Sequence, residues 1–281
     1  MTWRGFFHIY IVIEGESDLQ YAQIMVKGEG KNRKKFIRKK VIAVMPAYNA
    51  EKTLQATVKD IPRGVVDEII LVDDNSTDGT VALAKQLGLT VIEHTKNVGY
   101  GGNQKTCYKE ALRRGADIVV MIHPDYQYDS SLTDELVKPI ANGRFTIMFG
   151  SRIRTRKEAL DGGMPKVKYF LNRVVSLIEN IILGVNFTEH MSGFRAYSKK
   201  VLTVLPLENF SNDFVFDQQL MIAAIAYGFP IAEYPVPVRY FSDASSIQYL
   251  KGAKFLLQTF EVLFLFFLNK TTIYTSPIFI S

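Results

Sequence analysis

The 281-residue chain contains a single cysteine, Cys107, and a single tryptophan. One cysteine excludes an intramolecular disulfide and any zinc site built from several thiolates. A small, buried apolar side chain is a commoner role for such a cysteine than a reactive thiol. The sequence has no internal repeat and no low-complexity segment. Because 47% of its residues are apolar, the chain can bury one substantial core, and we expect one large domain with appendages.

The chain also lacks a broad excess of charge. Its formal net charge is +6, and the first 40 residues hold nine Lys and Arg against four Asp and Glu, which gives +5 of that total. The rest of the chain is therefore almost neutral, which argues against a nucleic-acid-binding face. The basic run KNRKKFIRKK (31–40) could contact anionic lipid headgroups. It could equally be a solvated stretch ahead of the first core strand.

Long hydrophobic runs are missing too. No stretch reaches the roughly 18 uninterrupted apolar residues expected of a membrane-spanning helix. The most apolar segment, FLLQTFEVLFLFFL (255–268), is short and contains Gln258 and Glu261, so it suits an interfacial helix, a partner-facing helix or a truncated anchor. Residues 6–13 lack the features of a secretory signal. We predict a cytoplasmic protein that is peripheral at the membrane.

Short apolar runs alternate with helical patterns from residue 41 onward. The runs are VIAVMP (41–46), EIILVDD (68–74), LTVIEH (89–94), ADIVVMIHPD (116–125) and FTIMFGSR (145–152). The clearest helical patterns between them cover 50–61 and 103–114. Apolar runs of this length, bounded by turn residues, are typical of buried parallel strands joined by helices. The sequence therefore predicts an α/β domain with an open, mostly parallel, Rossmann-like sheet, whose ligands bind beyond the carboxyl ends of the strands.

The strand pattern stops after residue 156. Residues 165–183 and 214–227 have helical spacing, and 231–240, which contains two prolines, is typical of a strand at a sheet edge. We divide the chain into a basic N-terminal extension (1–40), a catalytic domain (41–246) and an apolar, amphipathic helical tail (247–281). Residues 1–40 are not periodic enough to assign any element.

Acidic residues follow the second predicted strand. Asp73 and Asp74 end an apolar run and have no basic neighbour, which suits contact with a ribose, a base edge or a divalent cation. Asp78, a few residues later, could contact a ligand or could cap the helix that follows.

A second polar group follows the fourth predicted strand, in HPDYQYD (123–129). His123, Asp125 and Gln127 alternate, so an extended backbone would place all three on one face. There they could hold a divalent cation that bridges the two phosphates of a nucleoside diphosphate. A surface turn with clustered acids is the alternative.

Several motifs occur in a fixed order along the chain. They are PAYNAEKTL (46–54), VDDNSTDGT (72–80), KNVGYGG (96–102), PDYQ (124–127), GSR (150–152) and SGFRAYS (192–198). In this order they resemble the family 2 glycosyltransferases, most closely the dolichyl-phosphate mannose or glucose synthase branch. The resemblance covers about residues 40–246. It implies a GT-A fold, inverting transfer of a hexose from a UDP- or GDP-sugar, and a requirement for Mg²⁺ or Mn²⁺. It also implies a lipid-phosphate acceptor such as dolichyl phosphate, with a glycan as the alternative.

Carried over by position, the resemblance assigns donor binding to residues at the strand ends. They are Pro46, Tyr48, Asn49, Glu51, Asp73, Asp74, Asn97, Arg152, Arg239 and Ser246. Glu51 stands one place later than in the usual PxYNE form. Asp125 would be the principal metal ligand, with Gln127 beside it. His123 stands where the family usually has the first Asp of its D-x-D motif, so weaker or altered metal dependence is expected.

The resemblance also suggests the catalytic residues. Glu189 occupies the place of the family's Asp before SGFR and is the candidate base, with His190 as the alternative. Arg195 of SGFR, together with Arg152, would face the diphosphate, because a guanidinium group suits phosphate oxygens. Asp217 matches a later family position that closes over the donor.

Two other classes of protein were weighed against this function. A sugar-nucleotide-binding protein with weakened or lost catalysis would be consistent with His123 in the metal motif. A nucleotidyltransferase would need a Gly-rich phosphate loop with basic residues directly after the first strand, and PAYNAEKTL offers no such loop.

Overall fold

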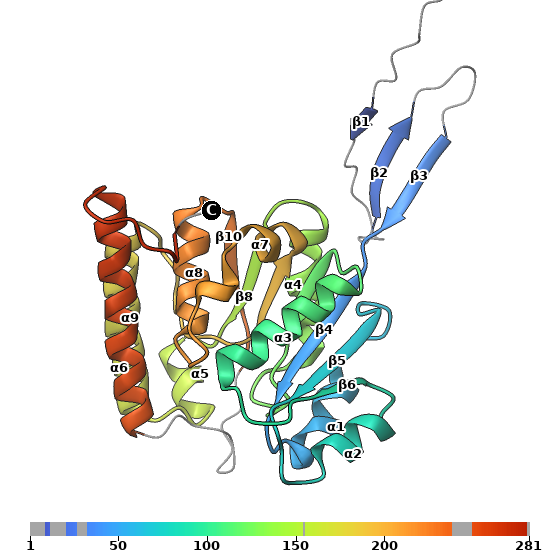
Figure 1. The fold of residues 1–281 in the computed structure, drawn as a ribbon, viewed down its shortest axis with the longest axis horizontal. Coiled ribbons are helices and arrows are strands. Elements are labelled where there is room, and N and C mark those ends of the chain that lie inside the picture. The colour runs from blue at the N-terminus through green and yellow to red at the C-terminus, as the bar shows by residue number, and fades with distance from the viewer. Residues whose placement is uncertain (1–8, 12–20, 27–32, 154, 238–248, 280–281) are drawn as a thin grey trace, which may run out of the picture.

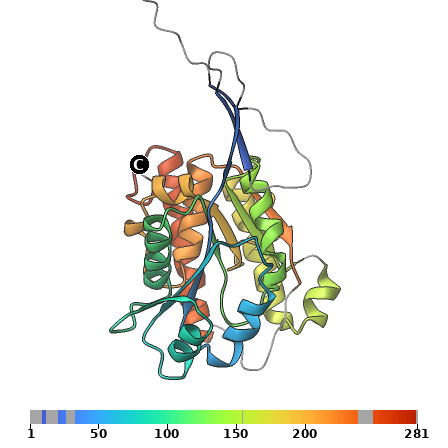
Figure 2. The same cartoon turned by 90° about the vertical axis from the view of Figure 1, so that its right-hand side faces the viewer.

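A computed structural model describes residues 9–11, 21–26, 33–153, 155–237 and 249–279. Its main body is a seven-stranded sheet in the order β10-β8-β9-β7-β4-β5-β6, with helices on both faces (Figures 1 and 2). The strands are β4 (Val41–Ala47), β5 (Glu68–Asp73), β6 (Thr90–Glu93), β7 (Ile118–Met121), β8 (Ile147–Ser151), β9 (Arg195–Ser198) and β10 (Ile231–Pro235). All neighbours pair in parallel except β9, which is antiparallel to both β7 and β8. The predicted open, mostly parallel α/β sheet is confirmed.

Helices cover the two faces of this sheet. They are α1 (Glu51–Asp60), α2 (Thr80–Gln86), α3 (Tyr100–Arg113), α4 (Thr133–Ala141), α5 (Arg156–Asp161), α6 (Lys166–Leu183), α7 (Lys199–Val204), α8 (Phe216–Ala226) and α9 (Tyr249–Lys270). Every residue of β4 is buried. Because side chains alternate along a strand, Ile42 and Val44 pack under α3, α7 and α8, whereas Ala43 and Met45 pack under α1, α2 and α4. The result is a three-layer sandwich.

Helix α3 begins at Tyr100, three residues before the start that the sequence pattern predicts. Two of the three glycines of the KNVGYGG motif, Gly101 and Gly102, therefore lie in its first turn instead of in a loop. A Cβ on Gly101 would lie 2.4 Å from the main-chain oxygen of Ser211 and 2.7 Å from Cβ of Phe216. Glycine at this position lets the helix start approach the segment before α8 closely.

Strand β9 is the element of the main sheet that the sequence pattern does not predict. It has four residues, begins with a charged one, Arg195, and lies between β7 and β8. It belongs to the SGFRAYS motif, which sequence analysis treats only as a ligand-binding segment. The antiparallel insertion fixes which side of the sheet each residue of that motif faces.

Part of the N-terminal extension forms a second sheet, although its sequence suggests no element. Strands β1 (Ile9–Ile11), β2 (Tyr21–Val26) and β3 (Arg33–Arg38) pair antiparallel in that order. The end of the basic run then meets the amino edge of the main sheet. There, Arg38 pairs with Asp67 at 2.9 Å, and the Lys40 ammonium donates to the Arg114 carbonyl at 3.0 Å.

The C-terminal tail is a long helix, as predicted. Helix α9 packs against α8 and lies beside α6 (Figure 1). One side of α9, which includes Val262, Leu263 and Phe266, belongs to the main core. By length and composition alone, Leu250–Lys270 would be sufficient to cross a membrane.

Candidate active site

The loops after β4 and β5 meet at the carboxyl edge of the sheet. Asn49 and Asn75 both have left-handed backbones, with φ of 51° and 66°, a conformation that Asn tolerates better than most residues. The Asn49 amide donates to the Ser76 hydroxyl at 2.8 Å, and the Asn49 side-chain oxygen accepts from the Thr77 amide at 2.8 Å. Two turns that are far apart in sequence thereby form one rigid rim. Tyr48 is exposed on this rim.

The carboxylates of Asp78 and Glu51 accept hydrogen bonds at the start of helix α2. Asp78 accepts hydrogen bonds from the amide and the hydroxyl of Thr80, the first residue of α2, although the N-cap position itself is Gly79. Glu51 accepts from the Gly79 amide at 2.9 Å. A Cβ on Gly79 would lie 2.3 Å from a Glu51 carboxylate oxygen, so glycine leaves room for this contact. The Glu51 carboxylate is therefore engaged in holding the β5–α2 turn.

Asp73 and Asp74 differ in what their carboxylates contact. Asp74 accepts from the amides of Val98 and Gly99 at 2.9 and 3.1 Å, and its Oδ1 lies 2.9 Å from the His94 ring. Asp74 therefore organises the loop before α3. Asp73 accepts from the Ser76 amide through one oxygen, whereas its other, buried oxygen has no hydrogen-bond partner in the described structure. Asp73 is thus the member of the pair with acceptor capacity left for a ligand.

Asn97 belongs to the same loop as the Asp74 contacts. Its side-chain amide donates to the Asp74 carbonyl at 3.1 Å, and its side-chain oxygen accepts from the Gly99 amide at 3.1 Å. Asn97 therefore lies at the carboxyl edge of the sheet, as predicted, and its side-chain hydrogen bonds hold the loop before α3.

The HPDYQ motif does not continue as a strand. Strand β7 ends at Met121, the chain turns at Pro124 and Asp125, and Tyr126 has a left-handed backbone with φ of 58°. The expectation that His123, Asp125 and Gln127 share one face of an extended segment is therefore wrong. Asp125 instead accepts from the Gln127 amide at 3.1 Å within a turn.

Arg152 and Glu189 form an ion pair that is shielded from water. Arg152 Nη2 lies 2.6 Å from Glu189 Oε2, and the Asn172 side chain donates to the same oxygen at 3.1 Å. The Arg152 amide also donates to Oε1. Burial alone would raise the pKa of Glu189, but the Arg152 charge and these hydrogen bonds hold it below its ordinary value. The carboxylate is thus ionised and fully engaged, and its role as the base stays a prediction.

Arg195 is turned into the interior. Its side chain is 1% exposed, and its guanidinium donates to the carbonyls of Ser192, Asp217 and His190 at 2.6, 2.9 and 3.0 Å. The reason is the register of β9, which pairs Arg195 with Met121, a residue of the core under α3 and α8. In this structure Arg195 therefore supports two backbone segments, residues 190–192 and the start of α8, and does not reach the surface of the site.

His190, the alternative base, is buried as well. Its Nε2 lies 2.9 Å from the Asn180 side-chain oxygen. Burial and the Arg195 charge lower the pKa of His190 to about 4, so the ring is neutral at physiological pH.

Lys168 is a site residue that sequence analysis missed. It lies in the first turn of α6, where burial and the Arg152 charge lower its pKa to about 8, while Glu189 and Asp125 oppose that shift. Its ammonium therefore interacts electrostatically with three predicted site residues. The signal in the sequence was the basic start, KVK, of an otherwise apolar helical pattern.

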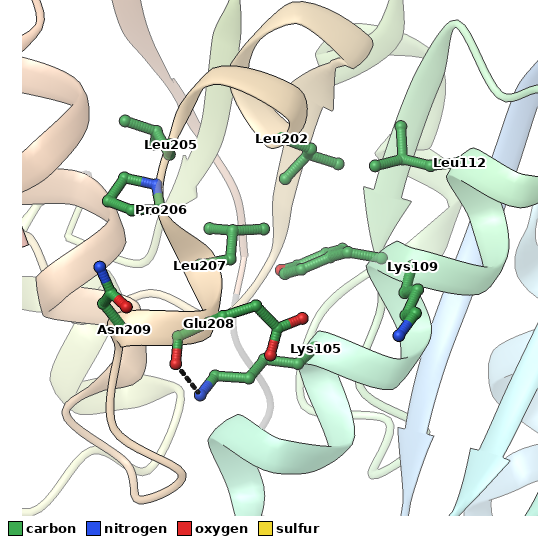
Figure 3. A pocket seen from close by; sticks show the side chains of 10 residues that line it. Lys105, Lys109, Leu112, Leu202, Leu205, Pro206, Leu207, Glu208 and Asn209 are labelled. Carbon is green, nitrogen blue, oxygen red and sulfur yellow. Dashed lines mark hydrogen bonds between the residues drawn. The ribbon is translucent and has the colours of Figure 1, made fainter. Parts of the chain in front are cut away.

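Two predicted donor contacts, Arg239 and Ser246, lie outside the described residues. A cavity of about 290 Å³ opens between α3 and the segment after α7 (Figure 3). Lys105, Lys109 and several leucines line it, and it includes none of the predicted site residues. The site at the strand ends is therefore separate from this cavity.

An open α/β sheet that carries acidic and polar side chains at the carboxyl ends of its strands defines a nucleotide-binding class of protein. Comparison with known sequences is more specific, because the model of the family described as "Glycosyl transferase family 2" matches residues 42–205. The chain belongs to this family, and it is an enzyme that transfers a sugar from a nucleotide sugar.

Relatives include a UDP-N-acetylglucosamine–dolichyl-phosphate N-acetylglucosaminyltransferase of Methanococcus voltae. It is 31% identical over 219 residues, covering 72% of this chain and 86% of the relative. A polyprenol monophosphomannose synthase of Mycolicibacterium smegmatis is 27% identical, covering 70% and 76%. Among solved structures, glucosyl-3-phosphoglycerate synthase of Mycobacterium tuberculosis, in complex with Mn²⁺, UDP and glucosyl-3-phosphoglycerate, superposes with a TM-score of 0.63 at 22% identity, covering 85% and 82%. This likeness shows the GT-A fold.

Proposed function

We propose that the enzyme transfers a hexose, with inversion, from a UDP- or GDP-sugar to a polyprenyl phosphate at the cytoplasmic face of a membrane. The observation that carries the proposal is the position of helix α6. Its first turn carries Lys168, whose ammonium interacts electrostatically with Asp125 and Glu189, and its second turn brings Asn172 onto Glu189. The outer side of the same helix is apolar and exposed. One element thus joins the sugar-transfer site to a surface suited to lipid.

Helix α9, which lies beside α6, exposes apolar side chains as well. The apolar plate, as we name it, consists of Val167, Phe170, Leu171, Val174, Leu177 and Ile181 on α6 and Leu250, Leu257, Phe260, Phe264 and Phe267 on α9. Most of the large exposed apolar side chains of the described residues lie here, and such a patch on a soluble surface marks a binding face. The two helices carry six Lys and Arg against two Glu, a balance that favours anionic lipid. Because α9 also packs on α8, we place it along the membrane surface and not across it.

A divalent cation, Mg²⁺ or Mn²⁺, fits the turn after β7. Among the described residues, no three His, Cys, Asp or Glu side chains gather as a closed metal site. Asp125 and His123 offer two donors, an oxygen and a nitrogen, and the donor diphosphate would supply further oxygens. Magnesium is commonly held in this way, by few protein ligands plus substrate phosphates. When bound, the cation would offset negative charge on the departing nucleoside diphosphate.

The remaining chemistry requires the protein to align two charged groups, the acceptor phosphate and the diphosphate of the donor. A phosphate oxygen of the acceptor forms a bond to the anomeric carbon while the bond from that carbon to the diphosphate breaks, and the bonding electrons leave with the diphosphate. An acceptor phosphate is already ionised, so it needs to be positioned more than deprotonated. We assign Lys168 the role of holding that phosphate. Glu189, which Arg152 keeps ionised, orients Asn172 and the start of the loop that follows β8.

The test is sugar transfer by the Asp125→Asn variant. Purified protein is incubated with each radiolabelled UDP- and GDP-sugar and with a membrane extract or a defined polyprenyl phosphate, and the labelled lipid is identified. We expect Asp125→Asn to lower the transfer rate by on the order of 10²–10³-fold, since the charge of the leaving group is no longer offset. Asp134→Asn, at a partly exposed position on α4 paired with Lys138, is the matched control. Full transfer by a folded Asp125→Asn variant would defeat the assignment.

A further inference from the structure

His123 is joined to the protein interior by a chain of hydrogen bonds. Its Nε2 lies 3.0 Å from the Tyr100 hydroxyl, which donates to Asp217 Oδ2 at 2.7 Å. The other Asp217 oxygen accepts from the Gln104 side-chain amide at 3.1 Å. The Tyr108 hydroxyl in turn donates to the Gln104 side-chain oxygen at 2.8 Å, which fixes the orientation of that amide. The chain connects the turn after β7 with helices α3 and α8.

The direction of these bonds determines where His123 carries its proton. An ionised carboxylate accepts hydrogen bonds and donates none. The Tyr100 hydroxyl has one proton and gives it to Asp217, so it must accept from His123 Nε2. A neutral His123 is therefore the Nε2–H tautomer, and its Nδ1 keeps a free lone pair. Burial and the Asp217 charge raise the pKa of Tyr100 well above its ordinary value, so the tyrosine keeps its proton.

Packing fixes the ring as well as its proton. Tyr100 is stacked between His123 and Phe214, with ring centroids 5.5 and 4.8 Å away. A Cβ on Gly193 would lie 2.6 Å from both Cδ2 and Nε2 of His123, so the SGFR segment closes on that edge of the ring. The Nδ1 atom is on the other edge and makes no hydrogen bond with any described residue. His123 is only partly buried, and the turn that carries Asp125 follows it directly in the chain.

We propose that Tyr100 and Asp217 are positioning residues that hold His123 as the Nε2–H tautomer, so that Nδ1 serves as a nitrogen ligand to the cation of the donor diphosphate. The inference rests on the proposed function, because it requires a cation beside Asp125. It gives a physical role to the histidine that replaces the usual acid in the metal motif. An imidazole nitrogen binds Mn²⁺ better than it binds Mg²⁺, so the site should favour Mn²⁺.

The tautomer can be measured without any ligand. The chain has four histidines, so ¹⁵N-histidine labelling and long-range ¹H–¹⁵N correlation spectra give few signals, and a His123→Gln variant assigns the one that matters. We expect the wild-type His123 signal to have the Nε2–H pattern. A wild-type Nδ1–H pattern would overturn the inference.

Two substitutions change the chain in different ways. Tyr100→Phe keeps the stacked ring and removes the hydroxyl, so His123 should populate both tautomers. In Asp217→Asn, the side-chain oxygen of the new asparagine should continue to accept from the Gln104 amide, so its NH₂ group faces the Tyr100 hydroxyl. Tyr100 then accepts from this NH₂ group and donates its own proton to His123 Nε2. His123 should therefore shift to the Nδ1–H form. Tyr234→Phe removes the hydroxyl of a partly buried tyrosine on β10, outside this hydrogen-bond chain, and should leave the His123 signal unchanged.

Binding of Mn²⁺ in the presence of UDP gives the second measurement. Electron paramagnetic resonance counts free Mn²⁺, and pulsed spectra of ¹⁵N-histidine protein detect a nitrogen bonded to the ion. We expect a directly bound histidine nitrogen in wild type, and Mn²⁺ affinity about 10- to 100-fold lower in Tyr100→Phe and Asp217→Asn. Mn²⁺·UDP binding without a histidine nitrogen, or unchanged affinity in both variants, would overturn this inference alone. Failure of wild type to bind Mn²⁺ and UDP at all would overturn the proposed function.

Discussion

Glu189 and Arg152 show how charge is handled at single residues of this site. Both side chains are almost inaccessible to water and satisfy each other through several hydrogen bonds. Such a pair contributes little net stability compared with apolar residues, but removing one partner leaves a buried charge without compensation.

We therefore expect Glu189→Gln to lower the free energy of unfolding by about 3–5 kcal/mol, because Arg152 loses its counter-charge. Urea denaturation at pH 7 measures the change. The double variant Arg152→Met, Glu189→Gln should recover a large part of it. A single variant as stable as wild type would show that the pair is not shielded as described.

Glu179, on the inner side of α6, is also a buried carboxyl, but unlike Glu189 it has no basic partner that forms an ion pair with it in the described structure. Neither of its oxygens has a hydrogen-bond partner in the described structure, and burial raises its pKa from the ordinary 4.5 to about 8 against the opposing charge of Arg195. The folded state thus favours the neutral form. This contribution to stability is complete below pH 4.5 and is lost as the pH rises toward 8.

Replacing Glu179 by glutamine keeps a neutral side chain of the same shape. We expect wild type and Glu179→Gln to be similarly stable at pH 4.5, and the variant to become more stable than wild type by on the order of a few kcal/mol by pH 8 to 9. Denaturation midpoints of both proteins across this pH range measure the difference. A difference that does not change with pH would mean that Glu179 has an ordinary pKa.

At the scale of elements, α6 and α9 are unusual because each has one side in the core and the other exposed and apolar. Val175 and Leu183 of α6 are buried, whereas Phe170 and Leu177 are 65% and 60% exposed. The helical repeat of 3.6 residues per turn produces this division. A second apolar side needs a partner, and the excess of lysine and arginine on the two helices favours an anionic bilayer as that partner.

The apolar plate can be tested with lipid vesicles. We expect wild type to sediment with vesicles that contain an anionic phospholipid, and the double variant Phe170→Glu, Phe264→Glu to bind at least about tenfold more weakly, since each phenylalanine contributes roughly 1.5–3 kcal/mol when it leaves water. Val204→Glu is a suitable control, because Val204 is an exposed apolar residue on α7, outside the plate. Equal binding by wild type and the double variant would contradict the proposed membrane contact.

At the scale of the whole molecule, the predicted donor site draws on the loops after β4, β5 and β7 and on the loop before α3. A ligand that bridges these loops should stabilise the whole domain, because it binds only when they are assembled. The stabilisation should have one part from the nucleotide and a second part from the cation.

We expect UDP or GDP with Mn²⁺, at about 100 times the dissociation constant, to raise the melting temperature by roughly 5–10 °C. EDTA should remove the metal-dependent part of the increase. The same part should be missing in Asp125→Asn, while Asp134→Asn should respond like wild type. A metal-dependent increase that survives in Asp125→Asn would place the cation elsewhere.

Much of the fold follows from local patterns in the sequence. The apolar runs that become β4, β5, β7 and β8 are bounded by turn residues, so both their burial and their parallel direction could be predicted. Strand β6 pairs in parallel as predicted, but it lies at the edge of the sheet and is only partly buried. The motifs after these strands were predicted to meet at one edge, because parallel strands end on the same side. Strand β9 could not be found in this way, since four residues led by an arginine have no strand periodicity and owe their place to pairing with β7 and β8.

The sequence by itself determined the sheet, the order of the motifs and the membership of the chain in its family. Only the tertiary structure decided which charged groups remain available, because that depends on partners distant along the chain. The Asp74 carboxylate binds the loop at 97–99, whereas one oxygen of Asp73 has no hydrogen-bond partner in the described structure. Arg152 is held by Glu189. His123 is oriented by Asp217 through Tyr100. Local patterns specify which side of an element is buried, but long-range packing specifies which atom of a side chain is left to meet a ligand.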